Sequence, residues 1–364
     1  MAQPAEPTPK RHADLTRLRA ILIGWVILYH LDLLLDVAAD QAWAAPLLHR
    51  GYLGVDGFFL LSGFALWLGY GDRPPADWQA ARRFWLRRFA RTWPLHALVL
   101  LALGLVVGGA VLAGVAIRDP GRFGLREYLL QATLLHGWET TDRHAWNSPS
   151  WALSVEWAGY LTFPVLVQGL RRLPAAALPA LAGLALAGLW GLAGETAGLN
   201  QTLHLGLLRF GLEFALGMAL GRLATLGRLP SGALGWVAAL AVPAGLLLQA
   251  DALVVAGLAA LIPAIWLRQR PGGGSGLLHR LGEASFGTYI CWVFVEVAMV
   301  GLLRLAQPGP AGRLLLMAGG LAVACLLGWL AWRWGELPLQ RWVLARGGTA
   351  KPGPPVRLRG RPAG

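Results

Sequence analysis

Long apolar segments alternate with short polar ones along almost the whole chain. Ten of them reach the roughly 20 residues that a helix needs to cross a bilayer. They cover about residues 16–35, 52–71, 93–116, 150–170, 174–193, 203–222, 232–248, 251–267, 283–305 and 313–333. Because a backbone in lipid must satisfy its own hydrogen bonds, each segment is predicted to be a helix. The pattern predicts an all-α, polytopic membrane bundle of about ten transmembrane helices.

The basic residues give this bundle an orientation. With the N-terminus placed in the cytoplasm, 24 of the 32 Lys and Arg residues fall on inner segments, as the positive-inside rule requires. Both termini are therefore predicted to be cytoplasmic. Residues 1–346 form one membrane domain, and residues 347–364 form a basic, Pro/Gly-rich tail; Gly272–Gly274 is expected to be a connector. In the longest outer loop, residues 117–149, the stretch Leu125 to Trp138 is apolar enough for a re-entrant or interfacial helix.

Composition supports the membrane class and changes how the net charge is interpreted. Charged residues make up 14% of the chain and hydrophobic residues 56%, whereas soluble domains carry about 25% charged residues. The net charge of +13 could indicate a nucleic-acid partner, but the cations lie in clusters between apolar runs and form no nucleic-acid motif. No His and Cys cluster has metal-ligand spacing, and we expect neither a metal nor a tightly bound cofactor. The expected partner is the lipid bilayer, with no nucleic acid.

A few ionisable residues lie inside the predicted spans, where each costs roughly 2.5–3.5 kcal/mol on insertion scales. His30 follows Arg19 by eleven residues, which returns a helix to nearly the same face about 16 Å further along. Glu156 is expected at the depth of His30, in the outer half of the membrane. Asp56 opens the second span, where it could cap the helix or orient an imidazole. Each has a structural explanation alone, but together they outline a polar site.

Two further groups have competing explanations. Arg209 and Glu213 are four residues apart and could form a self-contained ion pair. Arg88 and Arg91 could simply set the topology. They nevertheless lie three residues apart on one helical turn. Because guanidinium groups bind phosphate through paired hydrogen bonds, Arg88 and Arg91 could form an anion site with Arg19 at the cytoplasmic rim.

In these positions the sequence resembles acyltransferase family 3, integral membrane O-acyltransferases whose bacterial members acylate surface glycans, lipid-linked sugars or macrolides. Five segments carry the resemblance, in order along the chain: Arg19-x10-His30; Gly51 to Phe64; Arg87-Arg88-x-x-Arg91-x-x-Pro94; Trp151-x-Leu153-x-x-Glu156; and Glu336-x-Pro338. One position departs from the family, since Trp292 stands where members often carry a histidine. This departure bears on the identity of the acceptor.

The resemblance implies an acyl-CoA donor, His30 as the essential catalytic residue, and arginines that serve donor binding. We therefore expect residues 1–346 to be an acyltransferase domain in a bacterial inner or plasma membrane. It would transfer an acyl group, with acetyl favoured, from acyl-CoA to a hydroxyl of a glycan, glycolipid or related acceptor. His30 would act as general base or as a transient acyl carrier, with Glu156 or Asp56 orienting it, and the donor phosphates would bind Arg19, Arg88 and Arg91.

A proton-coupled transporter is the alternative from another class, because an intramembrane His, Glu and Arg set also suits a proton relay. Inverted repeats would favour it, and the sequence contains none of convincing strength. An inactive membrane scaffold is a second alternative, which the intact His30 disfavours.

Overall fold

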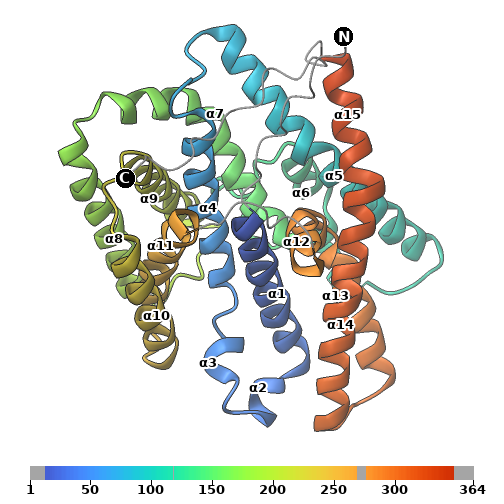
Figure 1. Cartoon of the computed structure of the whole chain (residues 1–364). Coiled ribbons are helices and arrows are strands. Elements are labelled where there is room, and N and C mark those ends of the chain that lie inside the picture. The colour runs from blue at the N-terminus through green and yellow to red at the C-terminus, as the bar shows by residue number, and fades with distance from the viewer. Residues whose placement is uncertain (1–12, 118, 269–275, 348–364) are drawn as a thin grey trace, which may run out of the picture.

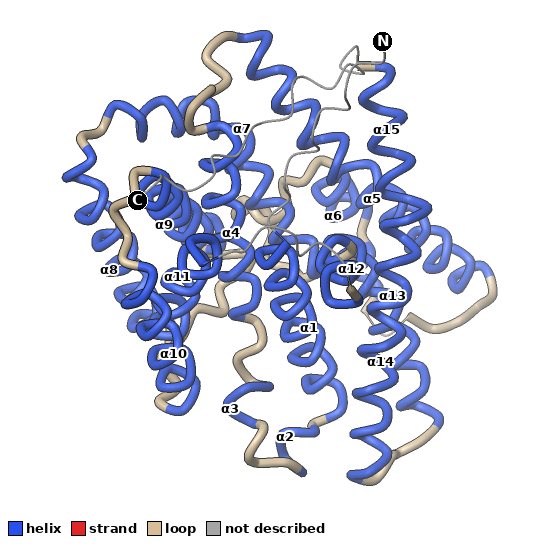
Figure 2. The backbone as a smooth tube through the Cα atoms, in the orientation of Figure 1, coloured by secondary structure: helices blue, strands red, loops and turns tan. Residues whose placement is uncertain are grey.

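The computed structural model describes residues 13–117, 119–268 and 276–347, and this part of the chain forms helices, turns and loops without any strand (Figures 1 and 2). Each of the ten predicted segments lies on a helix: α1 (Ala13–Leu35), α4 (Leu53–Tyr70), α5 (Trp78–Leu112), α7 (Trp151–Arg172), α8 (Leu178–Glu195), α9 (Gly206–Thr225), α10 (Ser231–Leu247), α11 (Asp251–Arg268), α13 (Ser285–Leu305) and α14 (Pro310–Leu330). The shorter helices are α2 (Val37–Asp40), α3 (Ala45–Leu48), α6 (Leu125–Ala132), α12 (Leu277–Glu283) and α15 (Leu337–Arg346). The all-α class is confirmed.

Seven helical stretches of the described chain are long and apolar enough to cross a membrane. They contain α1, α4, α5, α8, α11, α13 and the continuous run from α14 through α15. Of the other three helices, α10 has only 17 residues, while α7 and α9 carry ionisable residues along their length. The chain is thus a multi-pass membrane bundle. The count of ten crossings and the cytoplasmic termini remain predictions, and the tail beyond Gly347 and the Gly272–Gly274 connector lie outside the described residues.

Helices α1, α4 and α9 form the centre of the bundle, and glycines allow them to approach closely. A Cβ added at Gly54 would lie 2.7 Å from the Leu22 carbonyl oxygen of α1. Gly63 lies against the backbone of α9 at Phe214. Side-chain packing, not burial from water, drives helix association in lipid, so such contacts stabilise the bundle directly. In Figure 1 the red α14–α15 column stands on the right of the bundle, and α8 and α10 lie on the left.

The long loop before α7 folds back into the bundle. The indole of Trp93, on α5, donates to the Ala132 carbonyl (2.8 Å), and His96 pairs with the Gln131 carbonyl (3.0 Å). His96 lies 16 residues before the end of α5, or about 24 Å along the helix. Asn147, further along the loop, donates from Nδ2 to a backbone carbonyl of α13 (3.0 Å). These contacts favour the re-entrant alternative, and they make α7 begin inside the bundle.

Several basic helix ends lie together. The Arg222 guanidinium of α9 donates to the Leu173 carbonyl at the end of α7 (2.8 Å). The end of α15 at Gly347 packs against Leu86 in the Arg-rich first half of α5 (Figure 1). The Arg-rich residues and the apolar residues after Pro94 lie on one continuous helix, α5. This helix begins well before the predicted span, at Asp77, whose side chain caps it by accepting a hydrogen bond from the Ala80 N–H (2.7 Å).

Candidate active site

Three arginines from two helices come together toward the Arg-rich half of α5. The positive charge of Arg91, on α5, acts on that of Arg19, on α1, and both interact with Glu336 of the π-helical segment between α14 and α15. Arg88 lies over Tyr160, with its guanidinium carbon 5.8 Å from the ring centroid. Within the described ranges, no carboxylate oxygen lies within 4.0 Å of these three guanidinium groups. We call Arg19, Arg88 and Arg91 the arginine cluster; contact ion pairs do not cancel its charge.

Glu156 lies close to the arginine cluster. Its Oε1 accepts a hydrogen bond from the Ser62 hydroxyl of α4 (2.7 Å). It also bonds to Tyr160, one turn further along α7, and its charge acts on Arg19 and Arg88. Glu156 therefore balances part of the positive charge of the arginines.

The depth expected for Glu156 is therefore corrected, since it lies at the level of Arg19 and not at that of His30. Among the described residues, no hydrogen bond or ion pair joins Glu156 to His30. The reason is the re-entrant loop. We assumed that the fourth span begins at the outer surface, but Trp151 starts α7 inside the bundle, so five further residues carry Glu156 toward the arginine cluster.

Asp56 is held by a different partner from the one expected. The Arg209 guanidinium donates two hydrogen bonds to the Asp56 carboxylate, one from Nε to Oδ1 at 3.0 Å and one from Nη2 to Oδ2. Glu213 approaches the same guanidinium, with Oε1 3.8 Å from Nε, and all three side chains are fully buried. Asp56 is the fourth residue of α4 and Tyr52 is at the N-cap position, so Asp56 does not cap the helix. The geometry makes Asp56 a structural partner of Arg209, and among the described residues no hydrogen bond or ion pair joins Asp56 to His30.

His30 lies half-buried on the stretch of α1 beyond the arginine cluster. Its ring centroid is 5.1 Å from that of Tyr29 and 5.8 Å from that of Trp292 on α13. Neither ring nitrogen has a hydrogen-bond partner in the described part of the chain, which leaves both open to a substrate. Eleven residues of α1 separate His30 from Arg19, or about 16 Å along the helix.

A second histidine stands near His30 from the re-entrant loop, since the charges of His144 and His30 would act on each other. Its Nδ1 pairs with the Ser148 hydroxyl (2.9 Å) and its Nε2 with that of Thr202 (3.2 Å). Burial, and then the nearby charge of Arg122, lower the pKa of His144 below its ordinary value. His144 is thus neutral near pH 7 and adds no cation beside His30.

Four residues near these groups escaped the sequence prediction of the site. Ser62 and Tyr160 hold Glu156, Glu336 joins the arginine cluster, and Trp292 lies on His30. Each of them carried a signal in the sequence: Tyr160 follows Glu156 by one helical turn, Glu336 belongs to the Glu-x-Pro segment, Ser62 lies within the Gly51 to Phe64 segment, and Trp292 is the position that departs from the family. Their contacts, however, depend on which helices pack together, and spacing along one helix does not reveal this.

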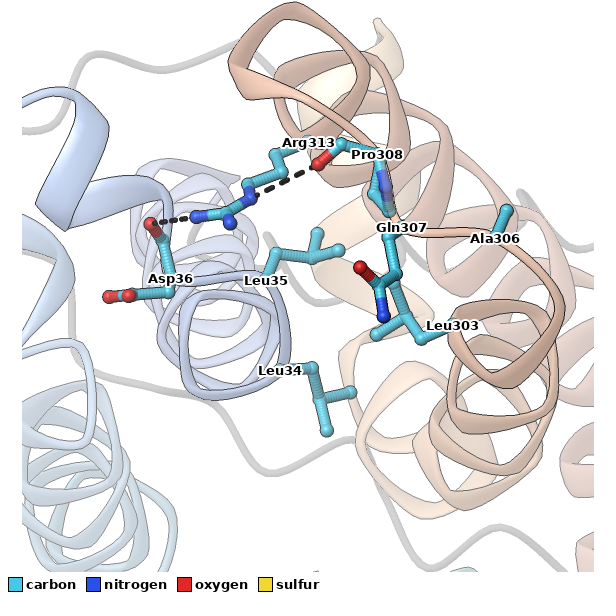
Figure 3. Close-up of a pocket in the computed structure, with 8 residues that line it drawn as sticks. All are labelled: Leu34, Leu35, Asp36, Leu303, Ala306, Gln307, Pro308 and Arg313. Atoms are coloured by element: carbon cyan, nitrogen blue, oxygen red, sulfur yellow. Dashed lines mark hydrogen bonds between the residues drawn. The ribbon is translucent and has the colours of Figure 1, made fainter.

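A pocket lies apart from these groups, at the ends of α1 and α13 and the start of α14 (Figure 3). Leu34, Leu35 and Leu303 give it apolar walls, and Arg313 crosses its rim, donating to the carbonyls of Asp36 and Pro308 (3.4 Å each). None of the predicted site residues lines it.

Comparison with known proteins identifies the family. The sequence profile of the acyltransferase domain family (Acyl_transf_3) matches residues 12–333. The chain belongs to this family. The chain is also 34% identical over 148 residues to acyltransferase MdmB of Streptomyces mycarofaciens; the match covers 37% of this chain and 34% of the relative's length. No solved structure matches the chain.

Family membership selects between the alternatives that the sequence left open. The bundle is a membrane-embedded acyltransferase domain, which favours group transfer over proton-coupled transport.

Proposed function

We propose that the protein transfers an acyl group, with acetyl favoured, from acyl-CoA to a hydroxyl of a glycan, glycolipid or related acceptor. The observation that carries this proposal is the charge of the arginine cluster. Three guanidinium groups meet two carboxylates, Glu156 and Glu336, without a contact ion pair, which leaves an excess positive charge for a polyanion. Guanidinium groups bind phosphate with charge-assisted hydrogen bonds, and CoA supplies several phosphates.

The reaction would take place at His30, further along α1. With its phosphates at the arginine cluster, a long, thin donor can extend about 16 Å along the helix to bring its thioester to the imidazole. His30 takes the proton from the acceptor hydroxyl as general base. The hydroxyl oxygen attacks the thioester carbonyl, the carbon–sulfur bond breaks, and the CoA thiolate leaves with the proton that His30 took from the hydroxyl. Glu156 would keep the arginines in position for the donor instead of orienting His30.

The arrangement also suggests a direction across the membrane. The arginine cluster lies toward the basic helix ends, which the positive-inside rule places in the cytoplasm, where acyl-CoA is made. His30 lies toward the other end of α1. We therefore place the acceptor on the outer side of a bacterial inner or plasma membrane.

His30→Ala tests the chemistry. The protein in oriented proteoliposomes would receive acyl-CoA on the basic side, and acylated envelope glycans and lipids would be identified by mass spectrometry. Loss of a general base typically lowers the rate about 10²–10⁴-fold, while acyl-CoA binding should persist because the arginine cluster is intact. His49→Ala is the matched control, since His49 is exposed and pairs with Asp32 outside the site (3.6 Å). Near-normal transfer by folded His30→Ala protein would refute the assigned role.

A further inference from the structure

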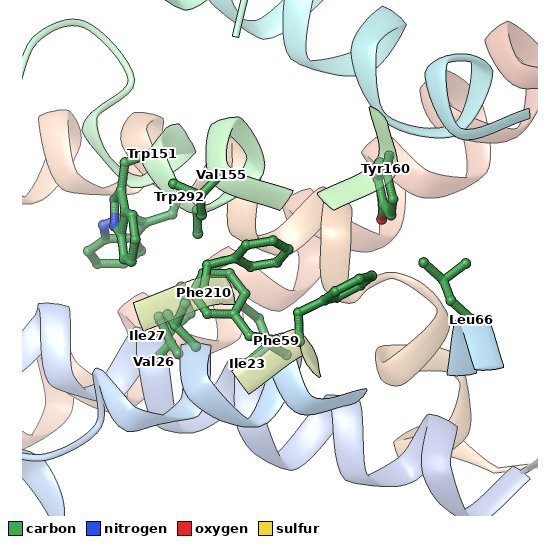
Figure 4. Packing of buried hydrophobic residues seen from close by; sticks show 14 of the residues in the cluster. Ile23, Val26, Ile27, Phe59, Leu66, Trp151, Val155, Tyr160, Phe210 and Trp292 are labelled. Atoms are coloured by element: carbon green, nitrogen blue, oxygen red, sulfur yellow. The ribbon is translucent and has the colours of Figure 1, made fainter. Parts of the chain in front are cut away.

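Among the residues that the structure describes, Trp292 has the largest side chain that is almost completely buried, with 1% of its surface exposed. It belongs to the apolar core cluster that also contains Trp151, Val155 and Phe210 (Figure 4). Its ring lies over His30, with 5.8 Å between centroids and a tilt of 33°. The indole is therefore fixed by packing next to the imidazole.

The indole N–H of Trp292 is buried and has no acceptor within the described ranges. This is unusual, because a buried tryptophan normally finds a partner for its N–H, and an unsatisfied buried donor costs about 1–3 kcal/mol. Other indoles in this chain do find an acceptor: those of Trp25, Trp67, Trp85, Trp93, Trp138 and Trp146 each donate to an oxygen at 2.7 to 3.1 Å. The Trp292 N–H is therefore a rigid hydrogen-bond donor beside the expected catalytic base, and an oxygen atom of a substrate could accept its hydrogen bond.

We propose that Trp292 is a further catalytic residue, whose indole N–H donates a hydrogen bond to the carbonyl oxygen of the acyl group during transfer. This inference rests on the proposed acyl transfer at His30. As the acceptor oxygen bonds to the carbonyl carbon, the carbonyl electrons move onto oxygen, and the N–H stabilises that negative charge. The carbonyl double bond re-forms as the carbon–sulfur bond breaks, the sulfur leaves with the negative charge, and the thiolate takes the proton back from His30. A donor held in place before the reaction stabilises the transition state without a cost of reorganisation.

The same contact has a second consequence for His30. When His30 takes the proton from the acceptor hydroxyl it becomes a cation, and an aromatic ring within about 6 Å attracts a cation through its face. One side chain thus lies close enough to serve both charges of the transition state, the imidazolium and the oxyanion. The neutral His144 does not oppose the imidazolium.

Two variants separate the N–H from the ring. Trp292→Phe keeps an aromatic ring without the donor, and 3-benzothienylalanine incorporated at position 292 keeps the shape of tryptophan with sulfur in place of N–H. Trp67→Phe is the matched control, because Trp67 is buried and its N–H already donates to the Thr225 hydroxyl (3.1 Å) away from His30. Each protein is compared for acyl-CoA binding and for the steady-state kinetics of transfer.

Both variants at position 292 should lower kcat about 10²-fold or more, the typical effect of removing one oxyanion donor, with little change in either KM or in acyl-CoA binding. The Trp67→Phe control should keep its kcat. An unchanged kcat, or a loss confined to the KM of the acceptor, would overturn the inference. If Trp292→Phe does not fold, the isosteric variant decides the question. Absence of transfer by the wild-type protein would refute the proposed function and this inference with it, whereas an active wild type with equally active variants refutes the inference alone.

Discussion

Replacing Asp56 with asparagine should destabilise the protein without a specific effect on the chemistry. The Asp56 carboxylate accepts two hydrogen bonds from Arg209, and neither side chain is exposed. Removing one partner of a buried ion pair costs about 3–5 kcal/mol, because the other charge stays buried. Glu213 lies 3.8 Å from the same guanidinium and remains as a counter-charge. We therefore expect the lower end of the range, about 3 kcal/mol.

Glu213 should behave differently from Asp56, although both face Arg209. Two carboxylates share one guanidinium, and neither oxygen of Glu213 has a hydrogen-bond partner in the described structure. Glu213→Gln replaces a buried carboxyl group that has no hydrogen-bond partner in the described structure and leaves the Asp56–Arg209 pair intact, so it should change stability little. Asp14→Asn is the surface control. Asp14 pairs with Arg17 at 2.6 Å in a part-exposed position, where an ion pair contributes about 0–1 kcal/mol.

Unfolding of each purified variant in detergent, by heat and by denaturant, measures the difference directly. Transfer activity is then expressed per folded molecule. The expected order of stability places Glu213→Gln and Asp14→Asn near the wild type and Asp56→Asn well below it, with substantial activity in the molecules that remain folded. An Asp56→Asn protein as stable as the wild type but without transfer would refute this reasoning, and would return Asp56 to the chemistry of His30.

Two other predictions concern the donor and the topology. Arg88→Ala and Arg91→Ala should each weaken acyl-CoA binding by about 1–3 kcal/mol, because a charge-assisted hydrogen bond is lost, and lysine should restore only part of the affinity. Calorimetry measures the affinity, and Arg82→Ala, at an exposed position of α5, is the control. Equal affinity in all variants would mean that these arginines only set the topology. A reporter fused after Arg361 should be active only as a cytoplasmic reporter, and activity on the outer face would contradict the ten-span arrangement.

The sequence was sufficient for the helices and for part of the site. Apolar runs place helices by length alone, so the ten segments match ten helices to within a few residues, except that α5 begins at Trp78, well before its apolar part. Arg19, Arg88 and Arg91 could be grouped because their spacing along α1 and α5, together with the charge rule, assigns both segments to one side. These predictions depend on the length, residue spacing and charge of single helices, which can be determined directly from the sequence.

The depth of a side chain in the bundle, and its partner on another helix, are harder to predict from the sequence. The Glu156 prediction measured depth from the start of the predicted span, and this fails when a polar loop folds back into the bundle. The loop is stabilised there by hydrogen bonds such as that from Asn147 to α13, between residues that are 143 apart in the chain. Asp56 is one of the two carboxylates predicted to orient His30, but Arg209 of α9 binds it in a bidentate manner. Nothing in the spacing of α4 identifies that neighbour.

The separation of the two ends of the site along α1 has a further physical consequence. On the face that Arg19 and His30 share, the intervening residues Ile23 and Val26 are 2% and 1% exposed and pack in the cluster that contains Phe59 (Figure 4). The glycines of α4 do not open this stretch, because α1 and α9 fill the space beside them. An open polar path between the arginine cluster and His30 would let protons and ions cross the membrane. An apolar stretch prevents this leak, and it must part when the thin arm of the donor enters. We therefore expect donor binding to repack the side chains around Ile23 and Val26, so that the route to His30 opens only when acyl-CoA occupies it.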